Sequence, residues 1–219
     1  MSTLITTKTD ITTVDLVTLT TLTPLELKSL TRTQLAALSS EQLGAFSVTL
    51  VSMLPLKYVS TEALAGISTE AIRGLDVKSL SVSQISGLSS TQIPALTTKQ
   101  MSALQPAQFN MLSTIGTLSA AQLGAIKATT FKGLTTDAAI PNLPTDTVAA
   151  LTSVQLSKLT TVNAGQLESF TPAQVAHFSS DALTWLHDQN FSTMSGTATT
   201  GSGIETSKNI TITVPLNAN

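Results

Sequence analysis

Apolar and polar positions recur along this chain with a period of eight residues. Residues 31–38, TRTQLAAL, are followed at once by residues 39–46, SSEQLGAF, and close variants of this octapeptide continue from about residue 11 to residue 186. The typical octapeptide opens with Ser or Thr, carries Gln or Glu at its fourth position, and has apolar residues at its fifth and eighth positions. A fixed short period of this kind is typical of a repeat protein.

The first and fourth positions predict the starts of helices. The side-chain hydroxyl of the first residue can accept a hydrogen bond from the backbone N–H of the fourth residue. The Gln or Glu side chain of the fourth residue can in turn accept from the backbone N–H of the first residue, and this pair of bonds is called the capping box. We expect it at Thr23/Glu26, Thr31/Gln34, Ser39/Gln42, Ser81/Gln84, Ser89/Gln92, Thr97/Gln100, Ser119/Gln122, Thr152/Gln155 and Thr171/Gln174. Pro24, Pro106 and Pro172 directly follow the first position, where a helix tolerates a residue without an N–H.

The octapeptide period predicts short helices. At 3.6 residues per turn, an apolar stripe with a period of eight rotates by roughly 80° per repeat, so one long helix could not keep the stripe on one side. A helix of one or two turns buries too little apolar surface to fold alone, and neighbouring repeats must complete the core. We therefore predict an all-α solenoid, a superhelix of short capped helices, over residues 11–195.

The octapeptide register slips at intervals, which suggests the size of one superhelical coil. Successive runs begin near Ile11, Leu56, Ile85, Ile115, Ile140 and Leu167, and counted from Leu27, which falls in the first run, they start 25 to 30 residues apart. We expect one coil per such interval, roughly 25 to 30 residues, with about three short helices as its sides.

The seventh position of the repeat is usually Ala or Gly, as in Ala37, Gly66 and Gly74. Glycine inside a helix costs about 1 kcal/mol, so its recurrence indicates a close approach of two backbones. The alternative is that these small residues only fill a solvent-exposed face.

Large side chains replace the small residue near the end of the repeats. His177 and Trp185 occupy this position, and we expect them to close the solenoid as a terminal cap. His187, Asp181 and Asp188 lie nearby, and two His with two Asp would be suitable metal ligands. A polar end cap explains these residues more simply, so no metal site is predicted.

Residues 1–10 and 196–219 lie outside the repeats. We interpret residues 1–10 as an N-terminal extension and the Gly-, Ser- and Thr-rich residues 196–203 as a linker. Residues 204–219 contain the alternating apolar residues Ile210, Ile212, Val214 and Leu216, which predict one β-strand. This strand could pair with another subunit, with the N-terminal stretch or with the edge of its own solenoid. A disordered tail is the alternative.

Composition excludes several classes of function. The 219 residues are 42% hydrophobic but only 11% charged, with a net charge of -2, and the eleven Lys and Arg are scattered singly, so no nucleic-acid partner is expected. Apolar runs stay well below the roughly 18 to 20 residues of a membrane-spanning helix, so no membrane insertion is expected. With no Cys, two His and few acidic residues, the sequence predicts no enzyme, no catalytic residues and no cofactor.

The repeat resembles those of known proteins. Units of the form Leu-Thr/Ser-x-x-Gln-Leu-x-Ala-Leu, from Leu30 through Leu104 and again from Leu118 to Phe178, resemble tandem repeats of large secreted and surface bacterial proteins of the adhesin-like kind. The resemblance implies an extracellular or bacterial cell-surface location. No signal peptide is seen at the N-terminus, so the export route is unknown.

Two functions are consistent with this sequence. The first is a structural repeat protein that assembles into a homo-oligomer or homopolymer, as the subunit of an extracellular filament or surface fibre, through end-to-end packing and strand exchange. Low surface charge favours such packing because association then costs little repulsion or desolvation. The alternative is a monomeric solenoid module that binds a glycan or a surface protein.

Overall fold

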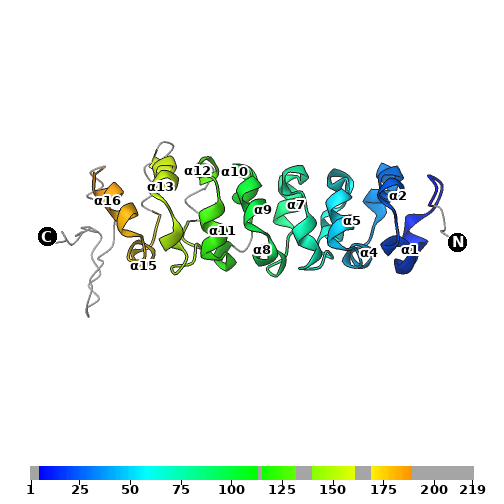
Figure 1. Ribbon diagram of the computed structural model, residues 1–219, viewed down its shortest axis with the longest axis horizontal. Coiled ribbons are helices and arrows are strands. Elements are labelled where there is room, and N and C mark those ends of the chain that lie inside the picture. The colour runs from blue at the N-terminus through cyan, green and yellow to red at the C-terminus, as the bar shows by residue number, and fades with distance from the viewer. Residues whose placement is uncertain (1–4, 113–114, 132–139, 161–168, 189–219) are drawn as a thin grey trace. The chain divides into compact units, whose positions relative to one another are not determined.

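The described part of the molecule is all helical. The computed structural model describes residues 5–112, 115–131, 140–160 and 169–188, and within these ranges the only regular elements are short helices (Figure 1). The α-helices have from four to nine residues. The all-α prediction is therefore confirmed for this part of the chain.

Some predicted segments lie outside the described residues. They are residues 1–4 of the N-terminal extension, the linker at residues 196–203, and the strand with Ile210, Ile212, Val214 and Leu216.

The chain divides into two compact units, residues 1–114 and 115–219, and each is considered by itself. The first unit contains η1 (Ile11–Thr13), α1 (Leu16–Thr20), α2 (Pro24–Ser29), α3 (Arg32–Ala37), α4 (Ser40–Gly44), α5 (Val48–Met53), η2 (Leu56–Tyr58), α6 (Thr61–Leu64), η3 (Ala71–Gly74), η4 (Val77–Ser79), α7 (Val82–Ser86), α8 (Gln92–Ala95), α9 (Thr98–Ala103) and α10 (Pro106–Phe109), where η marks a 3-10 helix. The described elements of the second unit are η5 (Ile115–Thr117), α11 (Ala120–Ala125), α12 (Ala128–Phe131), η6 (Val148–Ala150), α13 (Ser153–Thr160), α15 (Pro172–Val175) and α16 (Ser180–Asp188).

The eighth position of the repeat explains why each helix is short. Leu38, which follows α3, has φ −58° and ψ 132°, and Leu104, which follows α9, has nearly the same extended backbone. The next residue is again extended and caps the following helix, as Ser39 does for α4. Because two extended residues separate successive helices, each helix starts again in the same orientation toward the core. The side chains at the fifth and eighth positions therefore both point inward. Leu35 and Leu38 are accordingly 1% and 3% exposed.

Helices that are three places apart in the chain order pack against each other in the first unit. The contacting pairs are η1 with α3, α2 with α5, α3 with η2, α4 with α6, α5 with η3, α6 with α7, η3 with α8, η4 with α9, and α7 with α10. Three consecutive helices thus make one layer, and the fourth returns beside the first. The second unit also brings distant segments together, since α11 contacts η6 and α12 contacts α13.

The layer is shorter than the sequence predicted. Three octapeptides separate Leu27 of α2 from Val51 of the contacting helix α5. Two octapeptides and one shortened repeat unit separate Leu43 of α4 from Leu64 of the contacting helix α6. The predicted coil length is therefore wrong in this unit, because the register slips are short repeat units and not the boundaries of coils.

Glycine at the seventh position brings two layers together. A Cβ atom on Gly66 would collide with the backbone carbonyl oxygen of Ser40, and one on Gly74 with that of Val48. The predicted close backbone approach is confirmed at these two positions. At Gly124 a Cβ atom would lie 3.6 Å from the carbonyl oxygen of Ala150, which is ordinary van der Waals contact.

Substitution of Gly66 should therefore weaken the fold. We expect Gly66→Ala to lower the free energy of unfolding by about 1–3 kcal/mol, because a backbone carbonyl cannot move aside as a side chain can. Gly124→Ala, at the sixth repeat position inside α11, is a control for the loss of glycine without a backbone clash and should gain about 0.5–1 kcal/mol of helix propensity. Urea unfolding followed by circular dichroism measures both. An unchanged unfolding midpoint for Gly66→Ala would contradict the close packing of α4 and α6.

Candidate functional site

The most unusual chemical feature of the fold is a set of buried glutamines. Among the described residues, those at positions 34, 42, 84, 92, 100, 108, 122, 155 and 174 are at most 7% exposed. A neutral amide that leaves water must replace its hydrogen bonds, and it carries two N–H donors and one acceptor oxygen. The partners of these groups therefore show what the glutamines do.

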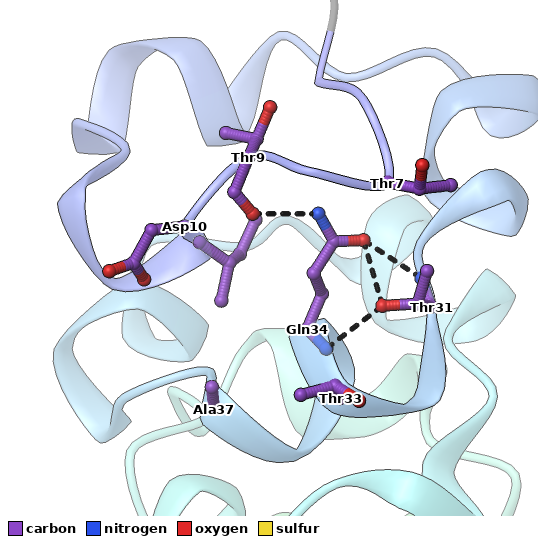
Figure 2. A pocket seen from close by; sticks show the side chains of 8 residues that line it. Thr7, Thr9, Asp10, Thr31, Thr33, Gln34 and Ala37 are labelled. Carbon is purple, nitrogen blue, oxygen red and sulfur yellow. Dashed lines mark hydrogen bonds between the residues drawn. The ribbon is translucent and has the colours of Figure 1, made fainter.

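Each glutamine oxygen caps the helix that carries the glutamine. The Oε1 atom of Gln34 accepts from the backbone N–H of Thr31 at 2.9 Å, and the Thr31 hydroxyl accepts from the Gln34 N–H at 3.2 Å (Figure 2). The same pair of bonds joins Ser39 to Gln42, Ser89 to Gln92, Thr97 to Gln100 and Thr171 to Gln174. At Ser89 the pair forms although α8 itself begins only at Gln92.

The glutamine nitrogens bind an earlier part of the chain. The Nε2 atom of Gln92 donates to the carbonyl oxygens of Leu64 at 2.9 Å and Ile67 at 2.7 Å. Seven others also bind two carbonyls that are three residues apart: Thr6 and Thr9 for Gln34, Ile11 and Val14 for Gln42, Leu56 and Val59 for Gln84, Ile72 and Leu75 for Gln100, Val77 and Leu80 for Gln108, Leu123 and Ile126 for Gln155, and Ile140 and Leu143 for Gln174. We call these eight glutamines the glutamine ladder.

The acceptors lie at the corners where one helix ends and the next begins. Val59 follows η2 and directly precedes Ser60, the cap of α6, and α6 packs against the helix α7 that carries Gln84. Gln84 therefore joins the start of its own helix to the corner beside that start. Helices this short leave most of their terminal carbonyls without an intrahelical partner. The ladder glutamines supply such partners by direct bonds.

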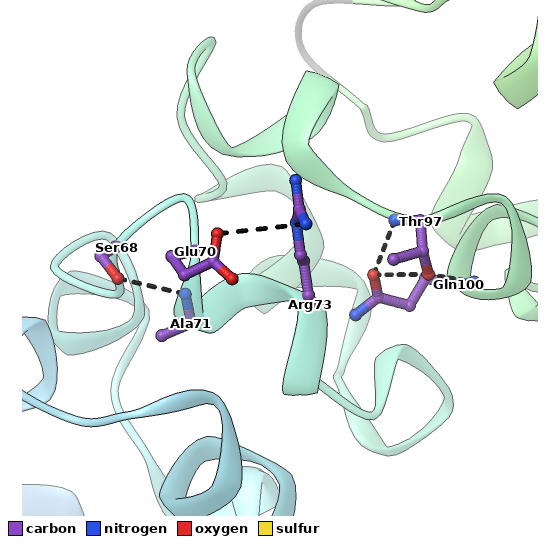
Figure 3. A network of polar contacts seen from close by, with 6 residues as sticks. All are labelled: Ser68, Glu70, Ala71, Arg73, Thr97 and Gln100. Atoms are coloured by element: carbon purple, nitrogen blue, oxygen red, sulfur yellow. Dashed lines mark hydrogen bonds and ion pairs between the residues drawn. The ribbon is translucent and has the colours of Figure 1, made fainter.

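Figure 3 shows one corner of the ladder together with the surface beside it. Gln100 of α9 bonds to Thr97, next to the segment that contains Ser68 and Ala71, where the Ser68 hydroxyl accepts from the Ala71 N–H at 3.1 Å. Glu70 and Arg73 form an ion pair at 4.0 Å in this segment, but both side chains are more than half exposed. An exposed pair of this kind contributes little to stability, so the buried amide is the stronger connection.

Sequence reasoning identified the caps of these helices but missed the second role of the glutamines. A capping box accepts Glu as well as Gln, so the near-exclusive use of Gln could have indicated that the N–H donors are needed. Gln108 was missed altogether because its partner, Gln105, replaces the usual hydroxyl residue. Gln108 nevertheless accepts from the Gln105 N–H at 2.9 Å, and its spacing of eight from Gln100 was the available signal.

The first layer departs from the ladder. The fourth repeat position is Thr18 in α1 and Glu26 in α2, and a carboxylate has no N–H to donate. Glu26 Oε2 accepts from the Thr23 N–H at 2.8 Å and from its hydroxyl at 2.7 Å. The third position of the same repeats holds Val17, 73% exposed, and Leu25, 79% exposed.

The predicted end-cap residues lie in the last described helices. His177 follows α15 with an exposed side chain, and its Nδ1 atom is 2.8 Å from the carbonyl oxygen of Ala173. Trp185 lies in α16 and is partly buried. An edge-to-face pair, Phe170 with Phe178, packs nearby in the chain, at 5.1 Å between ring centres. The capping role of His177 and Trp185 stays a prediction.

Other chemically active clusters are few among the described residues. No group of three or more His, Cys, Asp or Glu is arranged to hold a metal ion there, and none of the helices described has the length and apolar character needed to cross a membrane. Tyr58 is flanked by Lys57 and Arg32, at 4.7 and 5.0 Å from its ring centre. A hydrogen bond with Lys57 and the charge of Arg32 lower the pKa of the Tyr58 phenol.

The comparisons with known proteins agree with a repeat architecture. The ALTTAQ repeat matches residues 75–106, which include the ladder residues Gln84, Gln92 and Gln100. No curated protein and no solved structure matches the chain. The repeat character of this chain is thus supported independently of its hydrogen bonds.

The two roles of a ladder glutamine can be separated by substitution. Ser89→Ala removes the hydroxyl that accepts from the Gln92 N–H, together with its exposed bond to the Thr91 hydroxyl, and should cost about 1 kcal/mol. Gln92→Glu keeps the acceptor but removes both donors and buries a charge between two carbonyls, so we expect a loss of about 3–5 kcal/mol. Protonation would remove that charge and restore one donor, so the deficit of Gln92→Glu should shrink as the pH falls.

Urea unfolding at pH 7 and pH 4 measures these differences. If Gln92→Glu and Ser89→Ala lose equal stability at both pH values, Gln92 acts only as a cap and the bonds to Leu64 and Ile67 contribute nothing.

Proposed function

We propose that this protein is a structural solenoid that assembles with copies of itself, as the subunit of an extracellular filament or bacterial surface fibre. It acts as a scaffold and not as an enzyme. The repeated contact between helices three places apart supports the solenoid, because the same contact can continue for any number of repeats. The buried ladder supports a stiff stack of helices within the first unit, because its glutamines bond one layer to an earlier one at the corners.

The observation that carries self-assembly is the apolar surface of the first layer. The third repeat position is exposed elsewhere too, but there it is commonly polar, as at Thr33, Glu41 and Ser83. In α1 and α2 it is Val17 and Leu25, and Leu16, next to Val17, is 36% exposed. Adjacent exposed apolar side chains favour a protein partner. A second copy is the simplest partner for a chain with few charges to repel it.

A second candidate, the monomeric binding module, is favoured by Glu26. In a longer stack this position would face the corner carbonyls of a preceding layer, where Gln donates two bonds. A carboxylate there has no donor and would repel those oxygens. Glu26 therefore prevents the ladder from continuing past the first layer. Val17 and Leu25 are at the third repeat position, which is exposed in interior repeats as well, so a contact through them joins copies along their sides. If this contact between copies does not form, the solenoid remains a monomer that can bind a glycan or a surface protein along its side.

Substitution of the apolar pair tests the assembly. We expect the wild-type protein to form ordered filaments with rising concentration under negative-stain electron microscopy. The double variant Val17→Thr with Leu25→Thr should stay monomeric, because the apolar area that drives association is lost. Val154→Thr, at the same repeat position in the second unit and 60% exposed, is the control and should assemble normally. Monomers of the wild-type protein at every concentration would contradict self-assembly.

Deletion of residues 204–219 tests the proposed inter-subunit strand. If Ile210, Ile212, Val214 and Leu216 add a strand to a neighbouring subunit, the shortened chain should form shorter filaments or none, because the backbone bonds between subunits are removed. Light scattering on the two chains at equal concentration measures this. Equal assembly of both chains would assign these residues to a tail with no role in association.

A further inference from the structure

The three helices of a layer belong to three different sides of the stack in the first unit. One side contains α3, η2, η4 and α9, because α3 contacts η2, η4 contacts α9, and η2 and η4 are three places apart in the chain order. A second side contains α4, α6, α7 and α10, which contact each other in turn. Helix α1 belongs to this second side, since Gln42 of α4 binds the corner that directly precedes α1.

The first of these sides carries one exposed cation in each of four successive layers. These cations are Arg32, Lys57, Lys78 and Lys99, and the four helices contain no acidic residue. Arg32 and Lys57 come from different layers, yet both lie over the ring of Tyr58, at 5.0 and 4.7 Å from its centre. None of the four cations forms an ion pair with a described residue. We call this surface the basic side.

Two carboxylates lie at the ends of helices on the basic side. Asp10 precedes η1 and accepts from the N–H and the hydroxyl of Thr12. Asp76 precedes η4 and accepts from the backbone N–H of Lys78 at 3.3 Å. Both carboxylates are therefore bonded to the start of a 3-10 helix, and they reduce the positive charge of this side without removing it.

The second side has the opposite charge. Glu41 of α4 and Glu62 of α6 are exposed at the third repeat position of two contacting helices. Asp15, the cap of α1, adds a carboxylate in the first layer. The five helices of this side contain no Lys or Arg, and none of the three carboxylates has an ion-pair partner among the described residues. We call this surface the acidic side.

The third side, with α2, α5, η3 and α8, balances its charges locally. Glu70 and Arg73 form an ion pair at 4.0 Å beside η3 (Figure 3), and α2 contains both Glu26 and Lys28. In the described part of the first unit, rows of unpaired charge of one sign therefore distinguish the basic and acidic sides from the third side.

We infer that the acidic side of one copy docks on the basic side of a second copy. The inference rests on the proposed self-assembly and names the two surfaces that meet in it. Both rows place one charge in each layer, and packed helices lie roughly 8–10 Å apart, so a carboxylate that faces a cation brings its neighbour opposite the next cation. Unlike sides attract and like sides repel, so the contact is heterologous and can repeat from copy to copy. Val17 of α1 lies on the acidic side and adds apolar area to this contact.

Charge reversal tests the contact by light scattering across a concentration series. The double variant Glu41→Lys with Glu62→Lys has two basic sides, and Lys57→Glu with Lys78→Glu has two acidic sides. At about 50 mM salt we expect each double variant alone to need at least a roughly tenfold higher concentration than the wild-type protein to assemble, because like charges then face each other. An equimolar mixture of the two variants should assemble near the wild-type concentration, since each supplies the charge that the other lacks. Two misfolded variants would not rescue each other.

Single variants supply the matched control. Glu70 is at the same repeat position and in the same layer as Glu62, but on the third side. Glu70→Lys should therefore assemble at a lower concentration than Glu62→Lys, although both change the net charge equally.

The outcomes separate this inference from the proposed self-assembly. If the wild-type protein and both double variants assemble equally, the charged sides play no part and only this inference is overturned. The same holds if the mixture stays monomeric like its components. Monomers of the wild-type protein at every concentration would overturn the proposed self-assembly together with this inference. Binding of an acidic polysaccharide such as polygalacturonate by that monomer, lost in Lys57→Glu with Lys78→Glu, would then assign the basic side to a polyanion instead of a second copy.

Discussion

The structure depends on how very short helices satisfy their backbone hydrogen bonds. A helix of only a turn or two has almost no interior, so nearly all of its N–H and C=O groups are at an end. Solvent cannot reach those that face the core. The glutamine ladder answers both needs with one side chain, since its oxygen binds an N–H at the start of its own helix and its nitrogen binds two carbonyls at an earlier corner. The helices are therefore stable only together.

The same requirement explains the composition. Hydroxyl groups cap the helices, glutamines join the layers, and apolar residues, most often leucine or isoleucine, fill the fifth and eighth positions, so the first, fourth, fifth and eighth positions are seldom charged. Where Gln is absent from the fourth position, as at Ala63 and Ala71, the glycines that follow in the same repeats, Gly66 and Gly74, allow backbones to touch directly. The layers thus meet in two ways, by amide bonds at some corners and by close backbone packing at others.

Departures from the repeat are where specific behaviour arises in such a protein. Thr6, Glu26 and the pair Val17 and Leu25 all belong to the first layers, and each changes one property that the repeat keeps constant: the filling of a corner, the donor at a corner, or the polarity of an exposed position. The proposed assembly surface follows from these changes. The interior layers are more uniform.

The sequence by itself determined the local structure of this protein. A capping box connects residues only three apart, so Thr31 with Gln34 and Thr97 with Gln100 could be recognised without knowing the fold. The extended residue after helices such as α3 and α9 follows from the eight-residue period. The acceptors of the ladder could not be found in this way, because they lie much earlier in the chain and depend on how the corners stack. The number of residues in one layer was mispredicted for the same reason, because it is set by which helices contact each other, and these helices are three places apart in the chain order. Only the tertiary structure brings Arg32 and Lys57 over the ring of Tyr58, because no local pattern relates residues of different layers.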